Sequence, residues 1–419
     1  MTSIANFDIA TDLKVEIYLP NAASDAFILG VSDLGGTDLL SGDGTFVVGY
    51  SLLGGTDVLS DTSGIYAFIW EPVEATVSKL ETSLGGFIQN NIYFQPEPGE
   101  ISLQMQSWEY DPNNNTGVHA GARIRVRLDD GITTATLFSG FIETVNVIYR
   151  PEAPNQINIK AYDAHKRLVN SRITSWDTTS YGVSLTPKQQ IQTLATKLGY
   201  TVSSSSDNPA GALPTGTAAN VISNTYLNDA IEVGLAVFWI NPATGELEFR
   251  ERPAAATGGA TTYVIGNNHP VPPATNPYHL CMSDIKMTGD QTAMVNNLRV
   301  ALESTPATYV VVKDQDSIDL YGEISTDISL NTTDSTALTT WANAAFHGMP
   351  AKIVDTVQTP AKDRTGNLTQ AAFFTPGTLI GVNYTTSDIT IVDYYTIVQV
   401  SHSVDVDTWF TTLKLWKEF

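Results

Sequence analysis

The segment YYTIVQVSHSVDVDTWFTTLKLWKEF, residues 394–419, decides the fold class. Apolar and polar residues alternate on both sides of a short polar stretch that runs from Asp405 to Thr408. An alternation of period two is typical of a half-buried β-strand, and a short polar stretch between two strands fits a turn. The segment therefore predicts a β-hairpin.

The same segment holds the residue types of a hydrolase triad: Ser401, His402, Ser403, Asp405 and Asp407. Adjacent residues of a strand point to opposite faces, so both serines face away from His402. A triad also needs its members at hydrogen-bond distance, usually beside an oxyanion hole. We therefore interpret His402 as a structural residue, and we predict no catalytic residue and no enzymatic activity.

Strand patterns of the same kind follow one another between residues 91 and 163. Arginines alternate with apolar residues in RIRVRL (residues 123–128). Turn-forming clusters, DDG at 129–131 and PEAPN at 151–155, separate the apolar runs. These patterns predict an antiparallel barrel or sandwich of about 100 residues.

Helical patterns begin with LTPKQQIQTLATKLGY at residues 185–200. Thr186 and Gln189 form a capping-box signature, Pro187 suits the first turn and Gly199 suits the C-terminal end. Apolar residues recur at helical spacing at Ile191, Leu194, Ala195 and Leu198. The pattern predicts a helix packed on one face.

A second helix fits NTYLNDAIEVGLA (224–236), and a hairpin that turns at residues 241–245 follows it. The residues of this helix expected to face inward are Leu227, Ala230 and Ile231. One more helix fits DSTALTTWANAAFHG (334–348), with an expected inward face of Leu338, Trp341, Ala344 and Ala345.

Together the patterns predict a mainly β fold with a small α/β insert and two β-barrel-like domains. We place an N-terminal extension at 1–70, the first barrel-like domain at 71–170 and the insert at 171–255. A loop or linker region follows at 256–295, and the second barrel-like domain with one helix at 296–419. The extension repeats Gly-Gly-Thr-Asp at 35–38 and 54–57, which we interpret as two similar hairpin turns.

Composition excludes several classes of protein. A net charge of −22 argues against gripping nucleic acid, which needs Lys and Arg at the phosphates. Cys281 is the single cysteine, so no intrachain disulfide or multi-cysteine zinc site is expected. No apolar run reaches the length of a membrane span, and the first residues lack a secretory-signal pattern.

Other candidate sites have weak patterns, and we predict no metal site and no cofactor. Histidines outside the closing segment lack metal-ligand spacing: His119, His165, His269, His279 and His347. The carboxylates at 129–130 and 314–316 do not make a calcium loop. The stretch 108–117, with Trp108, fits a solvated turn better than a sugar-stacking loop. A glycosidase carboxylate pair stays open, because it depends on the fold.

Four stretches form a further pattern in chain order. Residues 136–170 hold a Phe-x-Gly strand and an apolar strand that ends in Asp and leads to Leu, here Phe138, Gly140, Asp163 and Leu168. The two helices and the hairpin of the insert follow. Residues 319–346 hold a Tyr-Gly strand, with Tyr321 and Gly322, and an Ala-rich helix at 337–346. The closing hairpin carries Ser401, His402, Trp409, Thr411 and Leu413.

Taken together, these stretches resemble the baseplate hub proteins of tailed bacteriophages, over roughly residues 90–419. The resemblance implies a homotrimer whose chains each give two barrel domains to a pseudo-sixfold ring. Such a ring adapts a sixfold tail tube to a threefold tip. DNA would pass through its acidic bore without specific binding.

The resemblance also implies partners and a place in the virion. The partners would be the distal tail protein, tail tube proteins, the tape measure protein and other tip or receptor-binding proteins. The protein would be made in the host cytoplasm and reside in the tail tip. The first 60 to 70 residues have no counterpart in the family, and we see neither a lysozyme-like insert nor a long C-terminal extension.

Three other functions stay open on the sequence alone. One is the neighbouring distal-tail adaptor, another β-rich ring protein of the same tip. The second is a tail-tip hydrolase that acts on cell-wall polymer, and the third is a carbohydrate-binding adhesin.

Overall fold

The computed structural model describes residues 13–20, 68–72, 76–89, 92–108, 119–129, 134–173, 184–214, 221–251, 263–267, 278–288, 294–346, 353–361, 368–405 and 408–417. The Gly-Gly-Thr-Asp repeat of the N-terminal extension lies outside these residues. The extension nevertheless contributes a described strand at residues 13–20 and the start of a second at residues 68–72, which the sequence pattern did not indicate.

The first part of the chain forms an antiparallel sheet in the order β3-β4-β7-β6-β5-β1-β2. Its strands are β1 (Leu13–Pro20), β2 (Phe68–Pro72), β3 (Thr76–Gln89), β4 (Tyr93–Ser107), β5 (Arg123–Asp129), β6 (Thr134–Ile148) and β7 (Asn155–Tyr162). The strands predicted between residues 91 and 163 are confirmed. In β5 the apolar residues Ile124, Val126 and Leu128 are buried in one core, while the arginines between them point outward.

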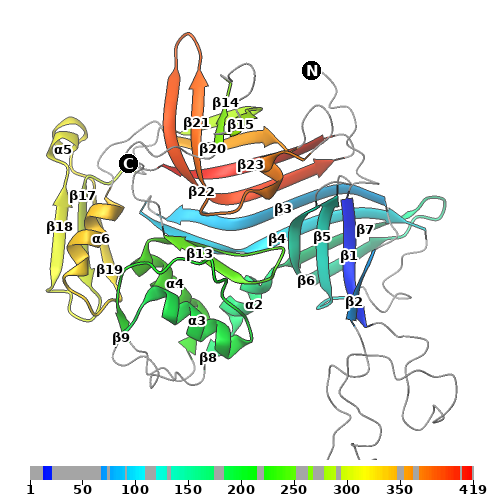
Figure 1. Ribbon diagram of the computed structural model, residues 1–419, viewed down its shortest axis with the longest axis horizontal. Coiled ribbons are helices and arrows are strands. Elements are labelled where there is room, and N and C mark those ends of the chain that lie inside the picture. The colour runs from blue at the N-terminus through cyan, green and yellow to red at the C-terminus, as the bar shows by residue number, and fades with distance from the viewer. Residues whose placement is uncertain are drawn as a thin grey trace, which may run out of the picture.

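The closing hairpin is confirmed as β22 (Thr390–Asp405) and β23 (Thr408–Lys417), with Asp405 opposite Thr408. β21 (Leu379–Thr385) pairs with β22, and β20 (Ile353–Pro360) pairs with β23. β22 also pairs with β3, from Gln399 opposite Gly85 to Asp405 opposite Lys79. The two predicted barrel-like regions therefore share one continuous sheet (Figure 1), and the described pairings close neither region into a separate barrel.

The range 256–295, predicted as loop or linker, contains strands of that sheet. They are β14 (Tyr263–Gly266), β15 (Tyr278–Cys281) and β16 (Asp284–Thr288). β14 pairs in parallel with both β15 and β21, and β16 pairs with β20. Strands of four or five residues show little alternation, so flanking Pro, Gly and Ala residues dominated the sequence pattern.

The insert packs beneath the sheet (Figure 1). Its elements are β8 (Arg172–Ile173), β9 (Ser184–Leu185), α3 (Pro187–Leu198), β10 (Leu213–Pro214), β11 (Val221–Ile222), α4 (Ser223–Gly234), β12 (Ala236–Ile240) and β13 (Leu247–Glu251). The helix α2 (Ala164–Asn170) precedes them in the chain and packs on α4. The capping box of Thr186 and Gln189 is present in α3, and Gly199 ends that helix in the left-handed conformation. Both predicted helices and the hairpin are confirmed, and their core includes Phe94 of β4 and Val398 of β22.

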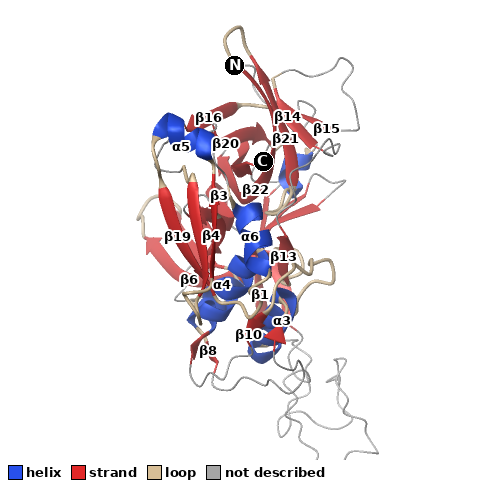
Figure 2. Cartoon of the chain, turned by 90° about the vertical axis from the view of Figure 1, so that its left-hand side faces the viewer, coloured by secondary structure: helices blue, strands red, loops and turns tan. Residues whose placement is uncertain are grey.

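Residues 294–346 form a separate part of the molecule that we call the three-stranded unit. Its strands β17 (Asn297–Leu302), β18 (Tyr309–Lys313) and β19 (Ser325–Leu330) make a separate sheet, and α6 (Ala337–Ala345) packs against it (Figure 2). Leu338, Trp341 and Ala345 are buried as expected, but Ala344 is exposed and Ala342 is buried instead. The spacing i, i+3, i+4, i+7 from Leu338 selects Ala342 rather than Ala344.

A short helix that the sequence analysis missed, α5 (Gln315–Tyr321), connects β18 to β19. Asp314 caps it by accepting a hydrogen bond from the Ser317 backbone N–H. Tyr321 therefore ends a helix and Gly322 follows as its C-cap, so the expected Tyr-Gly strand is wrong at these two residues. The strand begins at Ser325.

The mainly β class with a small α/β insert is confirmed. A short 3₁₀ helix, η2 (Gln370–Phe373), lies between β20 and β21. Within the described ranges, no helix has the length and apolar character needed to cross a bilayer. The domain boundaries at 70, 170, 255 and 295 remain a prediction, although α2 packs on the insert and Leu168 belongs to its core.

Candidate functional site

His402, the centre of the triad pattern, lies on the buried face of β22. Its ring atom Nδ1 lies 3.0 Å from Thr411 Oγ1 and accepts a hydrogen bond from Trp409 Nε1 at 3.4 Å. The Thr411 hydroxyl is also 3.3 Å from the carbonyl oxygen of Ala371. Ser403 and Asp405 are exposed, Ser401 lies on the opposite face of the strand from His402, and Asp407 lies outside the described residues. The described residues of this hairpin do not form a catalytic triad.

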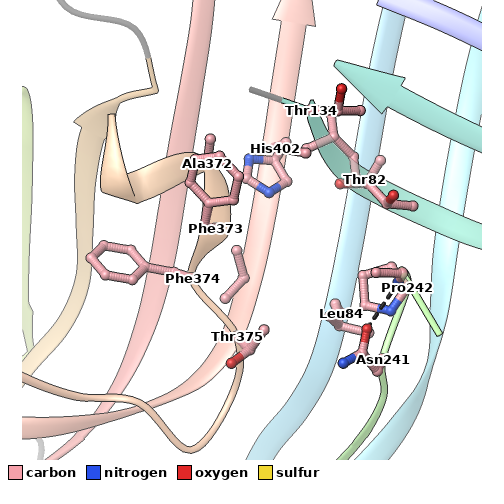
Figure 3. A pocket seen from close by; sticks show the side chains of 15 residues that line it. Thr82, Leu84, Thr134, Asn241, Pro242, Ala372, Phe373, Phe374, Thr375 and His402 are labelled. Carbon is pink, nitrogen blue, oxygen red and sulfur yellow. Dashed lines mark hydrogen bonds between the residues drawn. The ribbon is translucent and has the colours of Figure 1, made fainter. Parts of the chain in front are cut away.

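The His402 ring borders a cavity of about 180 Å³ where three parts of the chain meet. Figure 3 shows the imidazole beside Ala372 and Phe373, with Thr82 and Thr134 on another side. The insert contributes the turn of its β12–β13 hairpin, including Asn241. The cavity thus lies at the junction of the sheet, the insert and the segment around η2.

The chemistry of this cavity does not favour hydrolysis. Burial lowers the pKa of His402 to about 4, so its imidazole is a weak base, poorly suited to general-base catalysis at physiological pH. Its Nδ1 accepts a hydrogen bond from Trp409 Nε1, so the lone pair of that nitrogen is directed at the indole rather than at a nucleophile. Among the described lining residues, there is no carboxylate, serine or cysteine. We interpret the cavity as a gap in the packing where the sheet, the insert and η2 meet, without a catalytic role.

The other sequence-predicted residues do not come together either. His119 is exposed, His165 is buried, and His269 and His347 lie outside the described residues, as does the His279 side chain. The described residues contain no group of three or more His, Cys, Asp or Glu side chains placed to hold a metal ion. Trp108 is exposed, and the loop after it is not described.

The Asp163 motif joins the first sheet to the insert. The Asp163 carboxylate caps α2 by accepting a hydrogen bond from the backbone N–H of His165 at 3.0 Å. Burial raises the pKa of Asp163 to about 8, although backbone N–H groups at Gly99, His165 and Lys166 oppose that rise. A Cβ at Gly140 would collide with the carbonyl oxygen of Tyr162, so the Phe-x-Gly glycine lets β6 approach β7 closely. These motif residues have structural roles.

A second junction holds the three-stranded unit against α4 of the insert. The indole Nε1 of Trp341 donates to the backbone oxygen of Glu232 at 2.7 Å, and the Thr332 hydroxyl donates to the oxygen of Ala212 at 2.6 Å. Burial raises the pKa of Asp229 to about 6 and that of Glu232 to about 7. The nearby charge of Glu303 raises both pKa values further. This junction is therefore an acidic one.

The outer face of the sheet formed by β1, β5, β6 and β7 carries a cluster of basic and aromatic side chains that the negative net charge of the chain did not indicate. The Arg167 guanidinium carbon Cζ lies 3.2 Å from the centroid of the Phe141 ring, and that of Arg123 lies 5.8 Å from it. Lys166 and Lys160 lie over the Tyr162 ring at 4.3 and 5.1 Å. Phe141 and Tyr162 are register partners, so four cations surround two adjacent rings. Charge counted along the chain, rather than in total, would have indicated this cluster.

Comparison with known proteins places this fold among tail proteins. No family model matches the chain, and no curated protein matches it. The solved structure of the tail protein from Neisseria meningitidis MC58 matches with a TM-score of 0.55 and 14% identity, over 85% of this chain and 94% of that one.

Two prophage structures give similar values. The 43 kDa tail protein of prophage MuSo2 from Shewanella oneidensis matches with a TM-score of 0.51 and 11% identity, over 84% of this chain and 96% of that one. The prophage tail protein gp18 from Listeria monocytogenes EGD-e matches with a TM-score of 0.50 and 11% identity, over 83% of this chain and 91% of that one. The resemblance to phage tail proteins is thereby confirmed at the level of the fold.

Proposed function

We propose that this protein is a structural, non-enzymatic hub of a bacteriophage tail tip. The observation that carries the proposal is the extent of the shared fold, which spans more than four fifths of this chain and more than nine tenths of each of three tail proteins. A likeness over nearly the whole length of such proteins favours a shared structural role over an activity that a single site adds to the fold.

The hub acts as a homotrimeric ring. Two barrel-like regions of one chain, repeated three times, supply six similar surfaces to a sixfold tube while keeping a threefold tip. Closed symmetry is the ordinary state of such assemblies. The ring contacts the tail tube and the distal tail protein on one side, and the tape measure and receptor-binding proteins of the tip also contact it.

Charge supports a channel that DNA passes through. A net charge of −22 repels a phosphate backbone, so DNA slides through the ring without being held. The protein resides in the virion after synthesis in the host cytoplasm. The lowered pKa of His402, which makes its imidazole a weak base, and its hydrogen bond from Trp409 favour a structural role over a wall-degrading one.

The mass of the assembled particle tests the proposal. We expect particles of three times the 45.2 kDa chain mass, and electron microscopy of them should show a threefold ring with an acidic bore. A sixfold ring would assign the chain to the distal-tail adaptor instead. Release of fragments from purified peptidoglycan would support the hydrolase, and saturable binding on a glycan array the adhesin.

A further inference from the structure

The described residues at the two ends of the molecule differ in charge. Residues 123–172 contain eight Lys and Arg and five Asp and Glu, although acidic residues outnumber basic ones by 44 to 22 in the whole chain. The three-stranded unit contains seven Asp and Glu but only Arg299 and Lys313 as basic residues. Figure 1 shows β1, β5, β6 and β7 at one end of the long axis and the three-stranded unit at the other.

We define the basic face by its side chains on the outer side of the first sheet and on α2. Strand register places Lys14, Arg125 and Arg127 around Glu16. The ring contacts described above add the other members: Arg123, Lys160, Lys166 and Arg167. Three carboxylates balance part of this charge, since Glu16 pairs with Arg125 and Arg127, Glu100 with Lys160, and Glu143 with Lys166. Among the described side chains of this face, seven are basic and three are carboxylates.

The acidic counterpart is the tip of the three-stranded unit at α5, which we call the acidic tip. Asp316 and Asp319 are exposed on α5, and two large apolar side chains beside them are exposed as well, Leu320 at 67% and Tyr321 at 39%. The unit's two basic residues already have partners, because Arg299 pairs with Asp327 and Lys313 lies 3.9 Å from Glu323. Exposed apolar residues ringed by charge are typical of a protein interface.

We propose that the acidic tip of one copy docks on the basic face of the next copy, head to tail. Because the two surfaces lie at opposite ends of one chain, they cannot satisfy each other within it. A head-to-tail contact uses a different surface on each partner, and such contacts generate closed rings when the rotation closes. The carboxylates of the acidic tip then face the cations that cover the Phe141 and Tyr162 rings, and Leu320 and Tyr321 lie against the aliphatic parts of those side chains.

This inference rests on the proposed ring and identifies the two surfaces that build it. The test reverses charge on each side. Arg123→Glu with Arg167→Glu changes the basic face, Asp316→Lys with Asp319→Lys changes the acidic tip, and a chain with all four changes restores complementarity. Matched controls reverse exposed charges elsewhere, at Lys197 of α3 and at Asp388 between β21 and β22.

The particle mass is measured by sedimentation across a range of protein concentrations. We expect each two-site reversal to raise the concentration needed for half assembly about tenfold or more, and the four-site chain to recover most of that loss. Both controls should assemble like the parent chain. Carbodiimide cross-linking of the parent chain, followed by mass spectrometry, should join Lys166 or Lys160 to Asp316 or Asp319.

The outcomes separate this inference from the proposed function. If both two-site variants form rings at the same concentration as the parent chain and no such cross-link is found, the inference is wrong while the hub proposal stands. A parent chain that forms neither rings nor cross-links at any concentration overturns both. If a short DNA duplex binds the chain and Arg123→Glu with Arg167→Glu abolishes that binding, the basic face serves nucleic acid and the inference is wrong.

Discussion

The side-chain amide of Asn331 donates a hydrogen bond of 2.8 Å to the Asp229 carboxylate, and this bond links the three-stranded unit to α4. Asn331 thereby faces a half-buried group of carboxyls that includes Glu232. Burial outweighs the opposing effect of Asn331 on the pKa of Asp229. The junction therefore depends on pH.

The first prediction concerns this dependence. Raised pKa values mean that the folded chain holds protons which the unfolded chain releases, so the contribution to stability is complete below about pH 4 and declines up to about pH 7. Asp229→Asn with Glu232→Gln should remove that decline. We expect the variant to gain up to about 3 kcal/mol per group over the parent at pH 8, with little difference at pH 4.

Urea unfolding at a series of pH values measures this difference. Asp388→Asn serves as the control, because Asp388 is exposed in a different part of the molecule. A constant difference between variant and parent from pH 4 to 8 would contradict the assignment of the titration to this junction.

His402 is predicted to support the fold and no reaction. His402→Ala should lower the free energy of unfolding by about 2–3 kcal/mol, because it enlarges the cavity beside the ring and removes an acceptor of the Trp409 N–H. Ser403→Ala on the exposed side of the same strand should change it by less than about 0.5 kcal/mol. An esterase or glycosidase activity that His402→Ala abolishes without unfolding the chain would refute the structural role.

Leu194 tests the packing of α3 in the insert. Its side chain is fully buried in the core of the insert, so Leu194→Ala should lower the free energy of unfolding by about 3 kcal/mol. Leu194→Asp should lower it still more, because it buries an unpaired charge. Thermal unfolding compared with Lys197→Ala, an exposed position of the same helix, gives the measurement. Melting temperatures equal to the parent's would show that α3 does not pack as described.

Asp163 should act as a helix cap whose protonation favours folding. Its pKa is raised from 3.8 to about 8, so its contribution to stability falls as pH rises through that window. Asp163→Asn keeps a good capping side chain and should reduce this dependence of stability on pH. Asp163→Ala should lower the free energy of unfolding by about 1 kcal/mol or more at pH 5, because the cap is lost. Equal stability of the Asn and Ala variants at pH 5 would contradict the capping role.

Local signals predicted part of this fold well. The capping box at Thr186, the stripe around Leu194 and the hairpin at Asp405 are encoded within one turn or one pair of strands, so they can be recognised from the sequence. Pairing between distant segments leaves no such local signal. β1 pairs with β5 across more than 100 residues, and four-residue β14 pairs in parallel with β15 and with β21, a strand more than 100 residues away.

The candidate sites follow the same division. Strand alternation correctly separated His402 from Ser401 and Ser403, because face is a local property. The neighbours of His402 could not be read from the sequence, since Ala372 and Thr82 line the same cavity from other elements. The basic face was missed because its members come from β1, β5, β7 and α2, and the net charge of the chain has the opposite sign.

The pairing of β3 with β22 has a consequence for synthesis on the ribosome. The partners of β3 along this edge are more than 300 residues away in sequence. At typical elongation rates, roughly 15 to 60 s pass between translation of the two strands. Throughout that interval the β3 edge presents unpaired backbone groups to other nascent chains. Translation that stops before residue 399 should therefore yield insoluble chains even though the insert is already complete.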